Sequence, residues 1–216
     1  MTKVWKYGNS WENYPCRSGE VWIEQETNSK LAVWDLFDGL PAFMLEADLI
    51  YTDPPWNTGN MRSFYTKAGL STDDTFREFL EVLFDAVEEI NAPVCYLEIG
   101  KQNIDVFANC LGLIYPVVER WEVTYYRKNP SWLVRGGESP ATFDFTGHDD
   151  MDTPRLAMEN EWFSCVADLC MGRGLTAVTA FEMGQQFVGT ELHPRRLACT
   201  IDKVAKKGGA WHTTRL

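Results

Sequence analysis

The chain has 216 residues, six cysteines, three histidines and a formal net charge of −11, with an isoelectric point near 4.7. Its length suits one α/β domain, no apolar stretch approaches the ~18–20 residues that cross a bilayer, and the N-terminus does not read as a secretory signal. The acidic balance excludes the broadly basic surface that nucleic-acid-binding proteins normally carry. The cysteines and histidines lack the spacing of a zinc site. We therefore expect a single cytoplasmic domain over residues 1–216, with reduced cysteines, no metal and no membrane partner.

The first third of the chain predicts strands near 31–35 and 46–52, the second ending at a proline pair. Proline cannot donate to a sheet ladder and restricts the residue before it, so Asp53-Pro54-Pro55-Trp56 is expected to form a preorganised loop at the sheet edge. Such a loop suits a flat base with an exocyclic amine: the Asp53 carboxylate and Pro54 carbonyl accept the amine hydrogens while Trp56 stacks on the ring. Acceptors on both hydrogens favour a tetrahedral nitrogen, whose lone pair can attack an electrophile. The alternative is an ordinary strand-ending turn.

The middle of the chain predicts helices near 74–90 and 103–111 and strands near 92–99 and 119–127. The first of these helices is amphipathic with an acidic outer face. Between 120 and 135, aromatic residues are interleaved with arginine and lysine, which indicates either a strand surface that grips nucleic acid or an ordinary edge strand. Glycine and proline punctuate residues 129–161, so this range is expected to be an irregular insertion.

The last third predicts a strand at 162–168, a glycine turn, a helix at 175–183, a strand at 186–191 and a helix at 194–207. Gly172 and Gly174 let backbone N–H groups approach a ligand closely at a helix N-terminus. Glu191, at the end of the next strand, is well placed to bind the two ribose hydroxyls of a nucleotide-like cofactor. The alternation of strands and helices predicts a mostly parallel sheet covered by helices on both faces, with its ligand beyond the carboxyl ends of the strands.

Two motifs together resemble the S-adenosylmethionine-dependent DNA amino-methyltransferases that act on adenine N6 or cytosine N4. Asp53-Pro54-Pro55-Trp56 is similar to their catalytic motif, and the segment from Asp168 to Pro194 is similar to their cofactor motif. Because the catalytic motif comes first, the order resembles the permuted beta group, over roughly residues 31–207. The resemblance implies a Rossmann-like methyltransferase fold with a seven-stranded sheet and S-adenosyl-L-methionine as cofactor. The cofactor-binding residues that it implies are Asp168, Cys170, Gly172, Gly174, Glu191 and Thr153.

Some of these positions depart from the family pattern. Cys170 stands where relatives have phenylalanine, and Thr153-Pro154 is the nearest match to a Lys-Pro pair that relatives often carry. Relatives also place target recognition in the region of residues 129–161.

The function implied is methylation of an exocyclic amine of DNA in a bacterial or phage-infected cell. Aspartate at the first motif position favours adenine N6, and the target base would be flipped out of the duplex. Methylation of RNA, a free nucleotide or a modified base is an alternative, as is a non-catalytic partner subunit with the same fold. DNA contact would be confined to a basic strip. A homodimer is one candidate assembly, and a basic partner chain is another that would supply the missing positive charge. The candidate strip comprises Arg62, Lys67, Arg127, Lys128 and Arg135.

Overall fold

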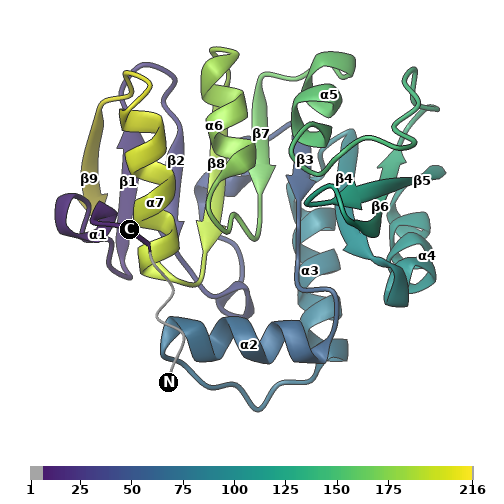
Figure 1. The fold of residues 1–216 in the computed structure, drawn as a ribbon, viewed down its shortest axis with the longest axis horizontal. Coiled ribbons are helices and arrows are strands. Elements are labelled where there is room, and N and C mark those ends of the chain that lie inside the picture. The colour runs from purple at the N-terminus through teal and green to yellow at the C-terminus, as the bar shows by residue number, and fades with distance from the viewer. Residues whose placement is uncertain (1–6, 216) are drawn as a thin grey trace.

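The computed structural model describes residues 7–215, which fold around one nine-stranded sheet with the order β5-β6-β4-β3-β7-β8-β2-β1-β9 (Figure 1). The strands are β1 (Glu20–Glu24), β2 (Lys30–Val33), β3 (Leu49–Thr52), β4 (Val94–Gly100), β5 (Val117–Tyr125), β6 (Asn129–Gly137), β7 (Cys165–Asp168), β8 (Gln186–Glu191) and β9 (Trp211–Arg215). The helices are α1 (Ser10–Asn13), α2 (Thr58–Ala68), α3 (Phe76–Ile90), α4 (Ile104–Ile114), α5 (Thr153–Asn160), α6 (Leu175–Glu182) and α7 (Pro194–Ala205). Short 3-10 helices lie at Leu36–Asp38, Ala42–Glu46 and Lys101–Asn103.

The five central strands, from β4 to β2, are all paired in parallel. Antiparallel pairing appears only towards the two sides, where β6 joins β4 to β5 and β1 joins β2 to β9. Parallel strands bring their carboxyl ends to one edge of the sheet, so the residues that follow β3, β7 and β8 meet there. The predicted parallel α/β sheet is confirmed, with two more strands than the seven expected.

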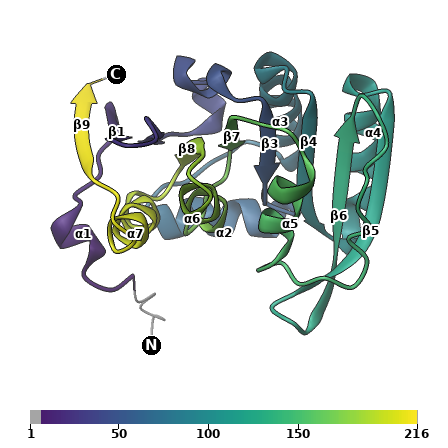
Figure 2. The same cartoon turned by 90° about the horizontal axis from the view of Figure 1, so that it is seen from above.

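Helices cover both faces of the sheet (Figure 2). The apolar face of α3 packs with α4 against one side, and the second buried cluster joins α5, α6 and α7 to the other. Strand β3 shows how side chains alternate between the two, because Ile50 belongs to the first cluster whereas Leu49 and Tyr51 belong to the second. Helix α3 begins with a capping box in which Thr75 and Glu78 satisfy each other's backbone N–H groups.

Every predicted strand and helix is present, within a few residues of its expected bounds. The elements missed are β1, β9, β6, α1, α2 and α5. The predicted irregular insertion at 129–161 is wrong at both ends, because residues 129–137 form β6, between β4 and β5 in the sheet, and residues 153–160 form α5. Pro130 is tolerated near the start of β6, opposite Thr124 of β5 and before the pairing with β4 begins at Ser131.

The irregular part of that range covers the outer edge of β5. Gly147 N–H donates to Glu122 O at 2.8 Å, Thr124 N–H donates to His148 O at 2.8 Å, and Asp150 N–H donates to Thr124 O at 2.7 Å. This segment therefore shields an edge strand that would otherwise expose unpaired backbone groups. None of the helices within residues 7–215 combines the length and apolarity required to span a bilayer.

Candidate active site

The loop that follows β3 places a carboxylate and an indole ring in contact. Trp56 Nε1–H donates to Asp53 Oδ1 at 2.8 Å and to the backbone oxygen of Glu98 at 3.2 Å. The ring lies directly against Gly100, where an added Cβ would come within 2.5 Å of Trp56 Cε3. Asn103 Nδ2–H donates to Trp56 O at 2.6 Å. The loop predicted to be preorganised is thus fixed by the end of the neighbouring strand β4.

Helix α2 begins directly after this loop. The side chain of Asn57 accepts a hydrogen bond from Asn60 N–H, which makes Asn57 the N-cap of the helix. This helix was not predicted from the sequence, although an asparagine shortly after a proline pair is a capping signal.

Asp53 retains hydrogen-bonding capacity. Its Oδ1 accepts from Trp56, and no described residue donates to its Oδ2. The pKa of Asp53 is raised to about 7: the low polarity of its surroundings is the largest cause, the charges of Asp168 and Asp150 add to it, and the Trp56 hydrogen bond acts in the opposite direction. The side chain is nevertheless exposed to solvent. The cost of ionising it is correspondingly smaller than burial alone would suggest.

Glu98 lies beside Asp53, because Thr52 and Leu97 are partners in the β3–β4 register. It is only 3% exposed, accepts a long 3.3 Å hydrogen bond from Tyr51 O–H at Oε2, and its buried Oε1 has no partner among the described residues. Burial and the charge of Asp53 raise the pKa of Glu98 well above its ordinary value. Sequence reasoning missed this second carboxyl group, because only the parallel register places it next to the loop.

The glycine turn after β7 has the backbone conformation that its sequence predicted. Gly172 and Gly174 have φ of +56° and +69°, values that favour glycine. A Cβ on Gly174 would lie 2.2 Å from Thr200 Cγ2, so this glycine allows α6 and α7 to pack closely. A Cβ on Gly172 would meet nothing closer than 3.9 Å, so space remains over that backbone for a ligand.

Two acids frame the turn. Asp168 Oδ1 accepts from Thr52 Oγ1–H at 2.8 Å and from Cys170 N–H at 3.1 Å, and it therefore ties the end of β3 to the turn. Glu191 Oε1 accepts from His193 N–H at 2.8 Å. Burial raises the pKa of Asp168 to about 6 and that of Glu191 to about 7. This edge of the sheet is thus rich in carboxyl groups whose ionisation a cationic ligand would favour.

Helix α2 crosses the same edge, below the carboxyl ends of the strands in Figure 1. Tyr65 O–H donates to Asp35 Oδ1 at 2.7 Å, Met61 is fully buried, and the guanidinium of Arg196 lies 4.8 Å from the centre of the Phe64 ring. Arg196 Nε is buried and has no partner among the described residues. Its charge lowers the pKa of both Asp53 and Glu191, so this arginine partly neutralises the site.

Two further predicted cofactor contacts, Thr153 and Cys170, differ in their surroundings. Thr153 is fully buried, accepts from Tyr51 O–H at 2.7 Å and donates to Asp150 O at 3.3 Å. It lies on the Glu98 side of the site, and its role as a cofactor contact stays a prediction. Cys170 is half-buried and packs against the α3 side of the core. Burial and the charges of Asp168, Glu191 and Asp53 raise the pKa of its thiol, so it lies among the carboxyl groups of the candidate site, and its role as a cofactor contact also stays a prediction.

The predicted basic strip needs one correction. Arg135 is 2% exposed, and its guanidinium bonds to Glu119 at 3.2 Å and to Glu161 at 2.8 Å, so it cannot reach a phosphate. The alternation of strand β6 directs it inward, which the sequence did not reveal because β6 was not predicted. Arg127 and Lys128 are exposed at the β5–β6 turn, Arg62 is exposed on α2, and Lys67 is half-buried over Phe64.

No protein-family model and no curated protein sequence matches the chain. Solved structures do. The complex of M1.HpyAVI with SAM superposes with a TM-score of 0.57 at 13% identity, over 81% of this chain and 98% of that one. TTHA0409 of Thermus thermophilus, a candidate DNA modification methylase complexed with S-adenosyl-L-methionine, has a TM-score of 0.56 at 16% identity, over 82% of this chain and 93% of that one. The chain has the fold of these two proteins. The methyltransferase fold predicted from the sequence is therefore confirmed, and at such low identity the comparison establishes the fold alone.

Proposed function

We propose that the protein is an S-adenosyl-L-methionine-dependent methyltransferase that acts on an exocyclic amine of DNA. The observation that carries the proposal is the 2.8 Å hydrogen bond from Thr52 to Asp168. It joins the end of β3, directly before the Asp53 loop, to the end of β7, directly before the glycine turn. The group suited to an amine therefore lies beside the backbone suited to a cofactor. Ordinary strand-ending turns would not require either the unpaired Asp53 oxygen or the open space over Gly172.

The residues present fit the cofactor. S-adenosyl-L-methionine, when bound, supplies a methyl group activated by a positively charged sulfur. Gly172 and Gly174 would let the cofactor come close to the backbone of the turn, in which Gly174 N–H already donates to Met171 O at 2.8 Å. Glu191 would accept from the ribose hydroxyls. The carboxyl groups with raised pKa values, Asp168 and Glu191, would favour a cationic ligand over a neutral one. Both solved structures with this fold described above are complexes with this molecule.

The chain's own residues then prepare the amine. Asp53 Oδ2 and the Pro54 carbonyl accept its two hydrogens, and Trp56 offers its ring to the base. With both hydrogens fixed, the nitrogen lone pair is directed away from the base plane towards the cofactor side. Such acceptors act mainly in the transition state, where positive charge develops on nitrogen. Asp53 also receives the proton that the methylated nitrogen releases.

Adenine N6 is our preferred target, because the first motif residue is aspartate, and the DNA substrate agrees with the name of TTHA0409. RNA, a free nucleotide and a modified base are the competing substrates, favoured by the acidic surface. A basic partner chain would compensate for that charge, and a homodimer is a further candidate assembly.

The test is methyl transfer by the purified chain. Calorimetry with S-adenosyl-L-methionine measures cofactor binding, and radiolabelled methyl transfer to DNA, RNA and free nucleosides identifies the substrate class. Nucleoside analysis of the product then distinguishes N6-methyladenine from N4-methylcytosine. Absence of cofactor binding, or binding without transfer to any of these substrates, would contradict the proposal.

A further inference from the structure

The turn between β5 and β6 has an unusual backbone conformation. Tyr126 and Arg127 have φ of +52° and +56°, in the left-handed region that glycine and asparagine adopt at little cost. Turns with two such central residues are normally built from Asn-Gly or Gly-Gly. Bulky side chains persist in this conformation only where the surroundings enforce it, and such positions concentrate at functional sites.

Two carboxylates enforce the turn. Asp150 Oδ1 accepts from Tyr126 N–H at 2.9 Å, and Asp149 Oδ2 accepts from Arg127 N–H at 2.6 Å. Burial would raise the pKa of Asp149, and the hydrogen bond from the Arg127 amide reverses the direction, so that pKa lies below its ordinary value. The Asp149 carboxylate therefore bonds to the backbone of the turn, while the side chains of Tyr126 and Arg127 are exposed.

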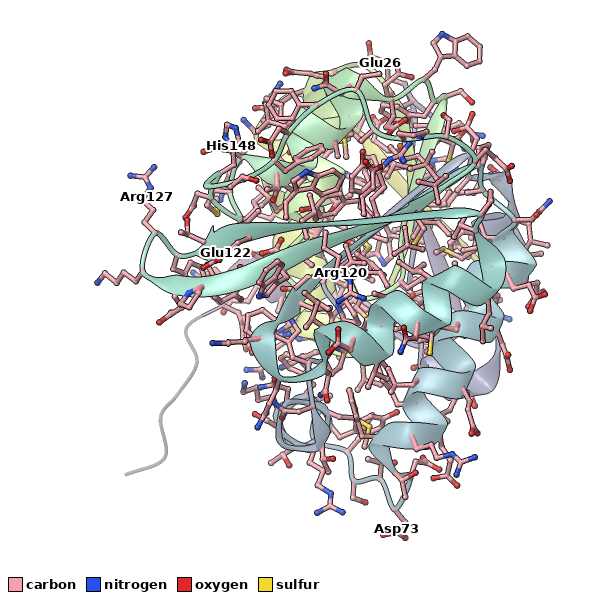
Figure 3. All side chains as sticks on the ribbon, turned by 90° about the vertical axis from the view of Figure 1, so that its right-hand side faces the viewer. Glu26, Asp73, Arg120, Glu122, Arg127 and His148 are labelled. Atoms are coloured by element: carbon pink, nitrogen blue, oxygen red, sulfur yellow. The ribbon has the colours of Figure 1, made fainter. Side chains whose placement is uncertain are left out.

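An aromatic series connects this turn with the Asp53 loop. The Trp56 and Tyr125 ring centres are 4.9 Å apart in an edge-to-face arrangement, and those of Tyr125 and Tyr126 are 4.3 Å apart. Tyr126 is 53% exposed, so the last ring of the series has a free surface. Arg127 projects into solvent from the tip of the hairpin (Figure 3), and its guanidinium bonds to no described residue.

A cleft of about 520 Å³ begins at the same ring series. It is lined by Trp56, Asn57, Gly100, Lys101, Gln102 and Pro130. Lys101 is the sole charged member of this lining. In a chain of net charge −11, a cleft without carboxylates beside an exposed arginine and lysine is a local exception that matches an anionic chain.

We propose that the Tyr125–Tyr126 pair is a stacking platform for the nucleotide next to the target base, and that Arg127, Lys128 and Lys101 contact the flanking phosphates. This rests on the proposed function and makes it more specific, because a free nucleotide has no neighbouring base to stack. The substrate is therefore a polynucleotide, bound with its strand locally unstacked. Aromatic rings with a cationic groove are the features by which proteins hold single strands irrespective of sequence.

The test is fluorescence anisotropy of a labelled single-stranded DNA oligonucleotide at low salt, with the full chain and S-adenosylhomocysteine. Tyr126→Asn should weaken binding about tenfold, because it removes one base-stacking ring. Asparagine is at ease at positive φ, so the melting temperature should change little. Tyr126→Phe should bind like the original protein. Trp162→Ala, which removes a 97% exposed ring elsewhere, is the matched control and should have no effect.

Equal binding by the original protein and Tyr126→Asn would overturn the inference, as would methyl transfer to free nucleosides without measurable oligonucleotide binding. Failure of the proposed function looks different. In that case cofactor binding or methyl transfer would be absent, although Tyr126-dependent binding of the oligonucleotide could still be observed.

Discussion

An aspartate stands at each end of strand β3, and the two carboxylates differ in how many hydrogen bonds they accept. Asp48, before the strand, accepts from Ser164 N–H at 2.9 Å, from Ser164 Oγ–H at 2.7 Å and from Cys165 N–H at 2.9 Å. Asp53, after it, accepts from Trp56 alone among the described residues. Both oxygens of Asp48 accept hydrogen bonds from the start of β7, whereas no described residue donates to Asp53 Oδ2. Asp48 is therefore a structural carboxylate, whereas the function that we propose for Asp53 uses the oxygen that the fold leaves without a donor.

The largest effect is expected from Asp53→Ala. Methyl transfer should fall by about 10²–10³-fold or more, because an acceptor that acts in the transition state is lost. Cofactor binding and the melting temperature should remain close to those of the original protein. Radiolabelled methyl transfer and calorimetry measure these quantities. Asp53→Asn is less informative, since the amide oxygen still accepts one hydrogen bond, and undiminished transfer by Asp53→Ala would remove Asp53 from the active site.

Asp48→Ala should show the reverse pattern. It leaves the Ser164 and Cys165 N–H groups without their acceptor, so we expect a loss of about 2–3 kcal/mol in the free energy of unfolding. Chemical denaturation measures this loss. The activity of the folded fraction should be retained. If Asp48→Ala instead impaired catalysis without destabilising the protein, the contrast between the two strand ends would be wrong.

Glu191→Ala should affect the cofactor side of the edge. Loss of a carboxylate that bonds to ribose hydroxyls is expected to weaken cofactor binding by roughly 2–3 kcal/mol. Titration calorimetry with the variant decides this. Glu182, on the surface of α6 away from the carboxyl edge, provides a control, since Glu182→Ala should leave affinity unchanged. An unaltered affinity in Glu191→Ala would show that β8 does not contribute to the cofactor site.

The melting temperature of the ligand-free protein should depend on pH, because the carboxyl groups at this edge of the sheet have raised pKa values. The folded pKa values of Glu191 (about 7) and Asp168 (about 6) lie above their unfolded values, so the folded chain binds protons more tightly. The stabilising effect of these protons is complete below about pH 4 and is lost as the pH rises from there to about 7. Melting temperatures across this window should fall less steeply in Glu191→Gln. A bound cationic cofactor should also reduce this fall in melting temperature. If the melting temperature fell equally steeply with pH in the original protein and in Glu191→Gln, the raised pKa of Glu191 would be contradicted.

The smallest effect concerns the salt dependence of DNA binding. Each phosphate contact contributes roughly −0.9 to the slope of log affinity against log salt, so the few cations available predict a slope of only about −2 to −4. Replacing Arg127 and Lys128 by alanine should reduce its magnitude by about 2 while leaving cofactor binding intact. Arg77→Ala, on the acidic outer face of α3, is the matched control, because its guanidinium pairs with Glu81. An unchanged slope in the double variant would show that Arg127 and Lys128 do not contact the DNA phosphates.

Local sequence determined the elements on which the candidate site is built. The apolar run before Asp53, the proline pair and the glycines before α6 each restrict the backbone without help from distant residues, and all lie where they were predicted. Their meeting at one edge also follows from the sequence, since parallel strands carry their ends to the same side.

Tertiary structure decided the rest. Strands β1 and β9 pair although they lie at opposite ends of the chain, as in Glu20 with Arg215, and nothing local in either segment signals the other. Strand β6, with its early proline and terminal glycines, becomes a sheet strand only because β4 and β5 supply partners on both sides. Arg135 is buried for the same reason. Likewise, Glu98 reaches the site through register, and Tyr126 keeps its left-handed backbone through an aspartate 24 positions away. Pairing between distant segments decides which polar side chains find hydrogen-bond partners within the fold and which remain without them. A single segment of sequence does not contain that information.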